Sequence, residues 1–187
     1  GIPAVLSASV GSKASLASDR MYKRAAEAGL LVLAAAGNDD DDACHYSPSR
    51  LGGDLQGNGA IPFLTIAAAN VDDSKAIYSN WGSCISMWAP GSGILAAKHN
   101  SNTEMTIMSG TSMATPIAAG VAALAFEVAG NTSMAPAGSA YSSFTHMTTK
   151  DAMTVKNWMI HSAQKDMITA VQPKSIIPVN FVQKVTS

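Results

Sequence analysis

The sequence predicts an α/β fold with a mostly parallel sheet and a buried central helix, in one domain that covers residues 1–187. Three features support this prediction. A β-compatible stretch, a helical stretch and an apolar stretch follow one another within residues 3–36, in the order of a βαβ unit. The third stretch is apolar without alternation, as in strands that are covered on both faces. A later Ala-rich run is apolar on all sides, which is typical of a helix inside a core.

The βαβ unit begins with a strand at residues 3–10. A helix is predicted at residues 15–28, because its apolar residues recur at helical spacing and Gly29 is a suitable stop. The continuous apolar run at residues 30–36 is the second strand. Residues 39–62 are polar, glycine-rich and long for a structureless connection, so we expect an elaborated, functional loop there.

The second half of the chain supplies the other elements. Strands are expected at residues 63–69 and 94–97, with a short extended piece at residues 88–91 between them. The central helix covers residues 111–128. A last strand is expected at residues 176–185.

A second helix is predicted to begin after Thr148, because Thr148 and Asp151 have the spacing of a capping box, and to reach about His161. Its buried face is expected to consist of Met153, Trp158 and Met159.

Composition excludes several classes of protein. With 47% hydrophobic and 13% charged residues, the chain is not intrinsically disordered. The 12 Lys and Arg residues are balanced by 13 Asp and Glu residues, so there is no basic field for a phosphate backbone and nucleic acid is not an expected partner. The most apolar run, residues 117–126, is shorter than the roughly 20 residues that a membrane span requires.

A serine motif opens the central helix: residues 109–116 are Ser-Gly-Thr-Ser-Met-Ala-Thr-Pro. Ser112 then lies in the first helical turn, where unpaired N–H groups and the helix dipole stabilise developing negative charge. Gly110 lets a substrate backbone approach closely. A lone Gly-Thr-Ser is more often a simple helix cap, but the whole string is much more specific.

An asparagine follows the second strand of the βαβ unit. Asn38 comes directly after Gly37, at the carboxyl end of a strand, where open α/β sheets place their sites. Its amide can donate to an oxyanion, and the backbone N–H of Ser112 can supply the second donor that acyl transfer needs. A Gly-Asn pair taken alone is more often a turn.

Together the serine motif and the Ala-Ala-Gly-Asn string at residues 35–38 resemble the subtilisin-like serine peptidases, most closely the proteinase K and aqualysin branch. The resemblance implies a subtilisin-like three-layer fold whose amino-terminal part is missing. It also implies that Ser112 is the nucleophile and Asn38 the oxyanion donor. In that family a segment like Ser-Val-Gly pairs with the substrate as an added strand. The implied substrate-binding residues are Ser9, Val10, Gly11, Ala35, Ala36, Gly37, Tyr46 and Gly110.

The two cysteines, taken by themselves, fit either one disulfide or two unrelated thiols. Aqualysin-like members have paired cysteines in matching contexts, so the resemblance implies a bond between Cys44 and Cys84, with two buried thiols as the alternative. Such a bond would contribute about 4 kcal/mol in the chain-entropy model and indicates an oxidising, secreted setting. Asn131 begins an Asn-Thr-Ser sequence and is a candidate glycosylation acceptor.

The chain also departs from the family. Subtilisin-like catalysis needs an Asp and a His that precede the oxyanion asparagine, and neither motif is present. Ile117 stands where the family usually has a His that is not the catalytic base. Ser86 replaces an Asp that commonly ligates structural calcium, so we predict no metal there. Residues 39–42 are interpreted as a solvated acidic loop, with a calcium site as the alternative. The reaction requires no cofactor.

The leading hypothesis is that this chain is the carboxyl-terminal part of a secreted serine endopeptidase that acts on polypeptides. Its Asp and His would lie on a missing amino-terminal segment, and the chain alone would be inactive or very weak. The alternative is a non-catalytic peptide-binding or inhibitory module. The loop at residues 51–60 is interpreted as a tolerated surface loop or as a contact to a propeptide or inhibitor.

Overall fold

The computed structural model describes residues 3–53, 61–130, 148–165, 167–169 and 180–181. In chain order its elements are β1 (Val5–Ala8), β2 (Ser12–Lys13), α1 (Leu16–Glu27), β3 (Leu31–Ala35), η1 (Ala43–His45), β4 (Tyr46–Ser47), η2 (Ser49–Gly52), β5 (Phe63–Ala69), β6 (Met87–Pro90), β7 (Ile94–Ala97), β8 (Met105–Met108), α2 (Thr111–Gly130), α3 (Thr149–Ser162), β9 (Gln164–Lys165) and β10 (Asn180–Phe181).

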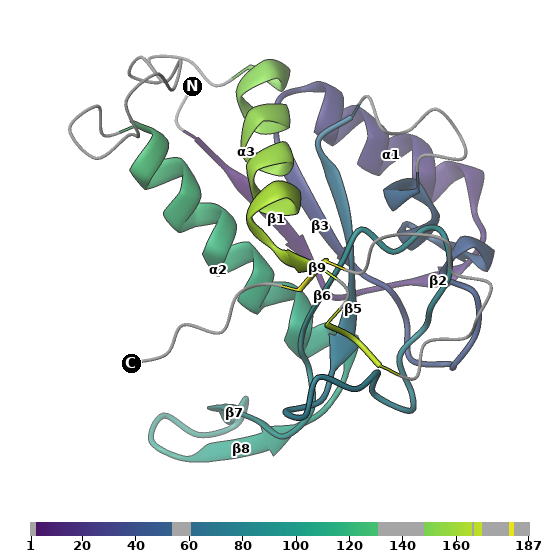
Figure 1. Cartoon of the computed structure of the whole chain (residues 1–187), viewed down its shortest axis with the longest axis vertical. Coiled ribbons are helices and arrows are strands. Elements are labelled where there is room, and N and C mark those ends of the chain that lie inside the picture. Colours follow the sequence, from purple (N-terminus) through teal and green to yellow (C-terminus); the bar gives the residue numbers. More distant parts are fainter. Residues whose placement is uncertain (1–2, 54–60, 131–147, 166, 170–179, 182–187) are drawn as a thin grey trace.

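A six-stranded sheet in the order β1-β3-β5-β6-β10-β9 forms the middle layer of the molecule. Each neighbouring pair is parallel except β10 and β9. Helices α2 and α3 lie on one face of the sheet and α1 on the other (Figure 1). The described residues therefore form three layers, and the predicted α/β class is confirmed.

The βαβ unit at the start of the chain has the predicted order. Helix α1 begins after Ser15, whose side chain accepts a hydrogen bond from the N–H of Ser18, and it ends before Gly29. Gly29 has φ +99°, a conformation that glycine adopts without the strain a side chain would cause. Every residue of β3 is buried, as expected of a strand covered on both faces.

Alanines on helix α2 pack against the sheet. Ala114, Ala118 and Ala122 recur at every fourth position, and all three are completely buried. Because these side chains are small, the helix backbone lies close to β1, β3 and β5. Leu124, by contrast, is 61% exposed. The expectation that this helix is buried on all sides is therefore wrong for the described residues, since only one face contacts the sheet.

Helix α3 begins at the predicted capping box: the Thr148 side chain accepts from the N–H of Asp151, and the Asp151 side chain accepts from the N–H of Thr148. Its buried face is formed by Ala152, Val155 and Met159. Met153 is half-buried, but Trp158 is 45% exposed. The predicted burial of Trp158 is wrong, because it lies beside the helical stripe that faces the sheet.

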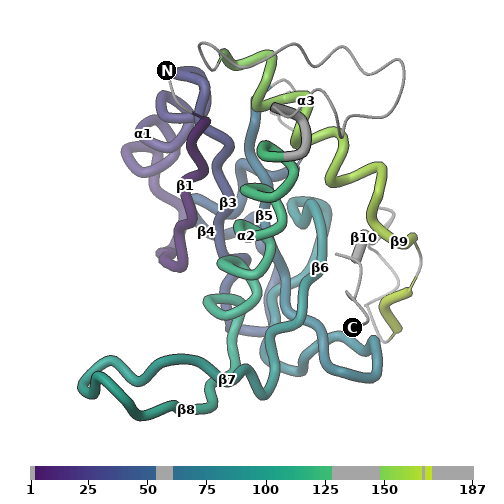
Figure 2. Tube along the Cα trace, turned by 90° about the vertical axis from the view of Figure 1, so that its left-hand side faces the viewer, coloured from purple at the N-terminus to yellow at the C-terminus, as the bar shows by residue number. Residues whose placement is uncertain are grey.

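The strand predicted at residues 94–97 is confirmed as β7, but it does not join the main sheet. It pairs with β8 in a separate antiparallel hairpin, which extends away from the three layers (Figure 2). The strand predicted at residues 176–185 is described only at β10. Asn131 and most of the loop at residues 51–60 lie outside the described residues.

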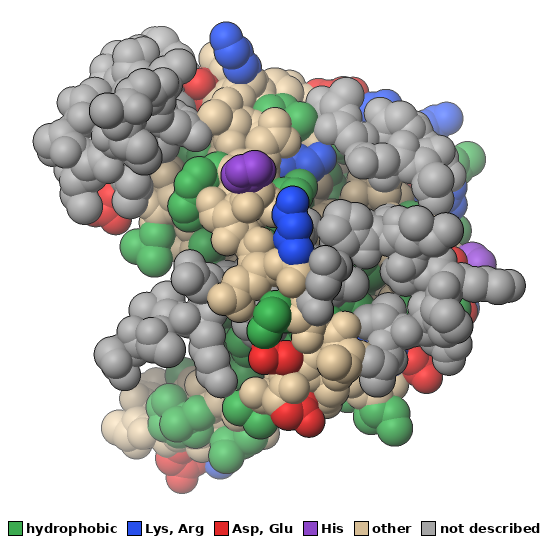
Figure 3. All heavy atoms as spheres, viewed as in Figure 1, with side chains coloured by type: hydrophobic (Ala, Val, Ile, Leu, Met, Phe, Trp, Pro, Cys, Tyr) green, Lys and Arg blue, Asp and Glu red, His purple; other side chains and the backbone are tan. Residues whose placement is uncertain are grey.

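The described surface carries both charge signs. On the face shown in Figure 3, basic side chains are scattered among acidic ones, as expected of a chain with a formal net charge of -1. Among the described residues, no helix is both long and apolar enough to cross a bilayer.

Candidate active site

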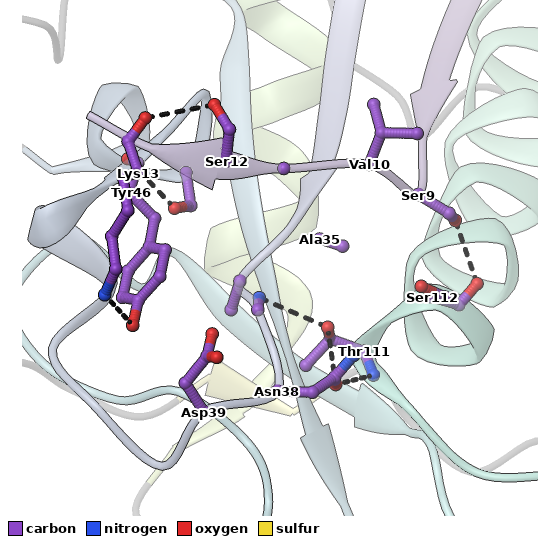
Figure 4. A pocket seen from close by; sticks show the side chains of 14 residues that line it. Ser9, Val10, Ser12, Lys13, Ala35, Asn38, Asp39, Tyr46, Thr111 and Ser112 are labelled. Atoms are coloured by element: carbon purple, nitrogen blue, oxygen red, sulfur yellow. Dashed lines mark hydrogen bonds between the residues drawn. The ribbon is translucent and has the colours of Figure 1, made fainter. Parts of the chain in front are cut away.

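A pocket of about 420 Å³ lies where β1 and β3 end and α2 begins (Figure 4). Every predicted catalytic and substrate-binding residue except Gly110 lines this pocket. The lining also includes five residues that the sequence did not indicate. The full set is Ser9, Val10, Gly11, Ser12, Lys13, Ala35, Ala36, Gly37, Asn38, Asp39, Tyr46, Ser49, Thr111 and Ser112.

The turn after β3 is held by a buried asparagine. Asn80 is completely buried; its Nδ2 donates to the carbonyl of Ala36 at 3.0 Å, and its Oδ1 accepts from the N–H groups of Asp39 and Asp41 at 2.9 and 3.1 Å. Gly37 has φ +105°, and a Cβ atom there would collide with the Asn80 side chain. Asn80 therefore fixes the turn that presents Asn38, although 42 positions separate these two asparagines in the sequence.

The carboxamide of Asn38 has a defined orientation. Its Oδ1 accepts hydrogen bonds from both the backbone N–H and the hydroxyl of Thr111, at 2.9 and 3.0 Å. The Thr111 hydroxyl in turn accepts from the N–H of Gly37 at 3.2 Å. Because both Thr111 groups donate, the atom that they contact must be the carboxamide oxygen, and the Nδ2 group at the other end of the carboxamide can donate to a ligand. It makes no hydrogen bond with any residue that the structure describes.

Ser112 occupies the first turn of α2, where helix N–H groups lack intrahelical partners. Its carbonyl accepts from the hydroxyl of Ser9 at 2.9 Å, which joins the end of β1 to the start of α2. The Ser112 hydroxyl itself has no hydrogen-bond partner within the described part of the chain. Among the residues that the structure describes, no histidine lines the pocket. The described residues thus bring the Asn38 amide and the Ser112 hydroxyl to one pocket.

The segment from Ser9 to Gly11 forms the rim of the pocket. All three residues are exposed, and their backbone groups make no backbone hydrogen bonds with the residues described here. An extended peptide could therefore pair with this segment as an added strand.

Tyr46 and Lys13 lie at the end of the pocket away from Ser112 (Figure 4). The Lys13 ammonium donates to the Tyr46 hydroxyl at 2.7 Å and lies 4.2 Å from the centre of the Tyr46 ring. Tyr46 donates to Asp41 at 3.2 Å. The Tyr46 hydroxyl raises the pKa of Lys13, and the backbone N–H of Asp42 lowers the pKa of Asp41.

A disulfide bond joins Cys44 to Cys84, as the resemblance implied, with an S–S distance of 2.14 Å and a Cα–Cα distance of 5.4 Å. It connects η1 to the loop before β6, across a sequence separation of 40. In the chain-entropy model a loop of this size contributes about 4 kcal/mol. The bond fixes the loop that carries Tyr46 and Ser49, both of which line the pocket.

The residues around Ser86 do not fit a structural calcium ion. The Ser86 hydroxyl accepts from the N–H of Thr65 at 2.9 Å and donates to the carbonyl of Gly52 at 3.2 Å. Thr65 donates to the carbonyl of Ser49 at 2.6 Å. Ser86 thus supplies a neutral hydroxyl where a hard cation favours a carboxylate, and the two nearby carbonyl oxygens each already accept a hydrogen bond. Within the described ranges, no three His, Cys, Asp or Glu side chains could hold a metal together.

The family model that matches this chain is that of the subtilase family, and the match covers residues 3–176. The chain is a member of the subtilase family. This subtilase is 43% identical over 122 residues to an extracellular serine proteinase of a Thermus species. The aligned region covers 65% of the chain and 28% of that protein. It is 42% identical over 120 residues to subtilisin-like protease 3 of Trichophyton equinum, with 64% of the chain and 28% of that protein covered.

Solved structures show the same fold. A cold-adapted subtilisin-like serine proteinase superimposes on this subtilase with a TM-score of 0.73 at 27% identity, covering 97% of the chain and 56% of that protein. A prenylagaramide maturation protease gives a TM-score of 0.63 at 28% identity, over 86% of the chain and 51% of that protein. The subtilisin-like fold is therefore confirmed. The chain spans about a quarter of the length of the curated relatives and about half of the solved ones.

Proposed function

We propose that this subtilase chain carries the nucleophile and the oxyanion donors of a secreted serine endopeptidase. Ser112 Oγ attacks the carbonyl carbon of a substrate peptide bond and gives up its proton. The resulting oxyanion accepts hydrogen bonds from Asn38 Nδ2 and from the backbone N–H of Ser112. The intermediate expels the amine, which takes up the proton that Ser112 gave to a base, and water then hydrolyses the acyl group on Ser112. The orientation of the Asn38 amide, with Oδ1 held by Thr111, is the observation that carries this proposal.

The proton of Ser112 needs a base, and we place that base and its orienting carboxylate on a polypeptide segment that precedes these residues. Two features of the structure support this position. Strand β1 pairs with β3 on one side only, so within the described residues its other edge is open. The chain after β1 reaches Ser112 through the Ser9 hydrogen bond. A segment that pairs with the open edge of β1 would therefore bring its side chains close to the nucleophile.

A polypeptide is the proposed substrate, bound through the exposed backbone of Ser9, Val10 and Gly11. A propeptide or protein inhibitor could occupy the same segment. The Cys44–Cys84 bond favours a secreted location, since disulfides persist in oxidising compartments. The names of the relatives as extracellular proteases agree with this location. No cofactor or metal enters the proposed reaction.

A non-catalytic peptide-binding or inhibitory module is the second candidate. The observation that favours it is the Ser112 hydroxyl, which has no base within the described part of the chain. The orientation of the Asn38 carboxamide argues against this candidate, because it leaves Nδ2 as an unpaired donor. A module that only binds peptides has no need for an unpaired amide donor beside a serine.

Labelling with a fluorophosphonate probe separates the two candidates, because the probe reacts with an activated serine. The intact natural gene product should label at Ser112, as located by mass spectrometry of its peptides. Ser112→Ala should abolish the label. Ser109→Ala is the matched control, since the Ser109 side chain accepts from the N–H of Gly93 and does not line the pocket. An intact protein that binds peptides but never labels at Ser112 would establish the non-catalytic module.

A further inference from the structure

The pocket contains a carboxylate that the proposed mechanism does not use. Asp39 lines the pocket directly after Asn38, and its backbone N–H is fixed by Asn80. Its carboxylate makes no hydrogen bond or ion pair with any residue in the described ranges. A Cβ atom built on Gly37 would lie 3.6 Å from Asp39 Oδ2, so the carboxylate lies close to the pocket wall (Figure 4).

The ammonium of Lys13 also lines the pocket but already has partners. It donates to the Tyr46 hydroxyl and lies over the Tyr46 ring. The Tyr46 hydroxyl has the largest effect on the pKa of Lys13, and the carboxylates of Asp41 and Asp39 raise it further. His45 lies 3.4 Å from Asp41 on the outer side, with a side chain that is 65% exposed. The pocket lining therefore holds one carboxylate, Asp39, and one ammonium, Lys13, and of these two only the ammonium has a hydrogen-bond partner among the described residues.

We propose that Asp39 gives the pocket a preference for substrates with Arg or Lys immediately before the scissile bond. The inference rests on the proposed function, because the pocket opens at Ser112 and Asn38 and would receive the side chain next to the carbonyl under attack. A cationic side chain that enters here reaches an exposed carboxylate without a partner. A pocket of about 420 Å³ lies within the roughly 300–1,000 Å³ usual for ligand sites.

Other side chains gain less from this pocket. An acidic side chain would approach the Asp39 carboxylate, and the one ammonium in the lining, that of Lys13, already donates to Tyr46 and lies over its ring. An apolar one would contact the small side chains of Ala35 and Ala36 and would leave the Asp39 carboxylate without a partner. Because Asp39 is exposed, its attraction for a cation is that of a surface ion pair, and we expect a preference of about 2- to 5-fold.

The test compares two peptide substrates that differ only in the residue before the scissile bond, one with arginine and one with citrulline. Citrulline has nearly the same shape but no charge. The ratio of their kcat/KM values is measured with the intact natural gene product and with Asp39→Asn, which keeps the size of the side chain. Asp40→Asn is the matched control, because Asp40 is the next residue but pairs with Lys75 outside the pocket.

The expected ratio is about 2 to 5 in the wild type and in Asp40→Asn, and about 1 in Asp39→Asn. In 1 M NaCl the wild-type ratio should also fall toward 1, because the screening length there is about 3 Å. Lys13→Gln should raise the ratio above the wild-type value. A wild-type ratio of 1, or a ratio that Asp39→Asn leaves unchanged, overturns the inference while Ser112 still labels with the fluorophosphonate. Loss of labelling at Ser112 overturns the proposed function and this inference with it.

Discussion

The hydroxyl of Thr111 is expected to control the rate of the chemical step through Asn38. Thr111→Val removes one of the two donors to Asn38 Oδ1 and the acceptor of the Gly37 N–H. The unpaired N–H costs about 1–3 kcal/mol of stability. Complete loss of an oxyanion donor lowers kcat by about 100- to 1,000-fold. Since the backbone N–H of Thr111 still holds Asn38, we expect a loss of about 10-fold in kcat.

The assay is steady-state hydrolysis of a peptide substrate by the intact protein, with kcat and KM measured separately. An oxyanion contact strengthens in the transition state, so kcat should fall while KM stays constant. Thr115→Val is the matched control, because the buried Thr115 donates only to the carbonyl of Thr111, within the helix. Thr111→Ser should restore the wild-type rate. If kcat of Thr111→Val stays within 2-fold of the wild type, or if only KM changes, the positioning role of Thr111 is refuted.

Three further predictions concern stability, measured by urea denaturation of the intact protein. Asn80→Ala leaves two N–H groups and one carbonyl without partners and should cost about 3 kcal/mol or more, whereas a loss below about 1 kcal/mol would contradict the role of Asn80. Replacing both Cys44 and Cys84 with Ala should cost about 4 kcal/mol, and an unchanged midpoint would show that the bond does not constrain the unfolded chain. The pKa of the Asp41 carboxyl group is below its ordinary 3.8. The stabilisation that the ionised carboxylate gives the folded protein is therefore present above pH 3.8 and is lost as the pH falls further. The stability difference between the wild type and Asp41→Asn should therefore shrink below about pH 3.8, and a difference that is the same at pH 6 and pH 2.5 would contradict this.

Local signals in the sequence predicted most of the fold. The apolar runs of β3 and β5, the cap at Ser15 and the capping box at Thr148 are each contained in a few consecutive residues. Which partner a strand chooses is not a local property, so β7 was predicted but its pairing with β8 was not. The exposure of Leu124 likewise depends on which elements cover α2, and helical periodicity does not contain that information.

The candidate site also contains residues that local motifs indicate and residues that only contacts between distant parts of the sequence bring in. Ser112 and Asn38 belong to short contiguous motifs and could be predicted from them. Thr111 lies inside the serine motif and Asp39 directly follows Asn38, so their positions next to the two predicted residues are the signal that indicates them. Lys13 reaches the pocket through a hydrogen bond to a residue 33 positions away, which no local pattern indicates. Asn80 likewise reaches the turn before Asn38 from a distant part of the sequence, and no local pattern indicates it.

The reaction rate of a fluorophosphonate with Ser112, compared between the wild type and Asn38→Ala, tests the central claim most directly. The phosphoryl oxygen of the probe takes the place of the oxyanion, so loss of the Asn38 amide should slow labelling of the intact protein by about 100- to 1,000-fold. The serine and its helix remain in place in this variant, because Asn38 is exposed and makes its side-chain hydrogen bonds only to Thr111 within the described residues. Equal labelling rates in the two proteins would contradict the assignment of Asn38 as the oxyanion donor.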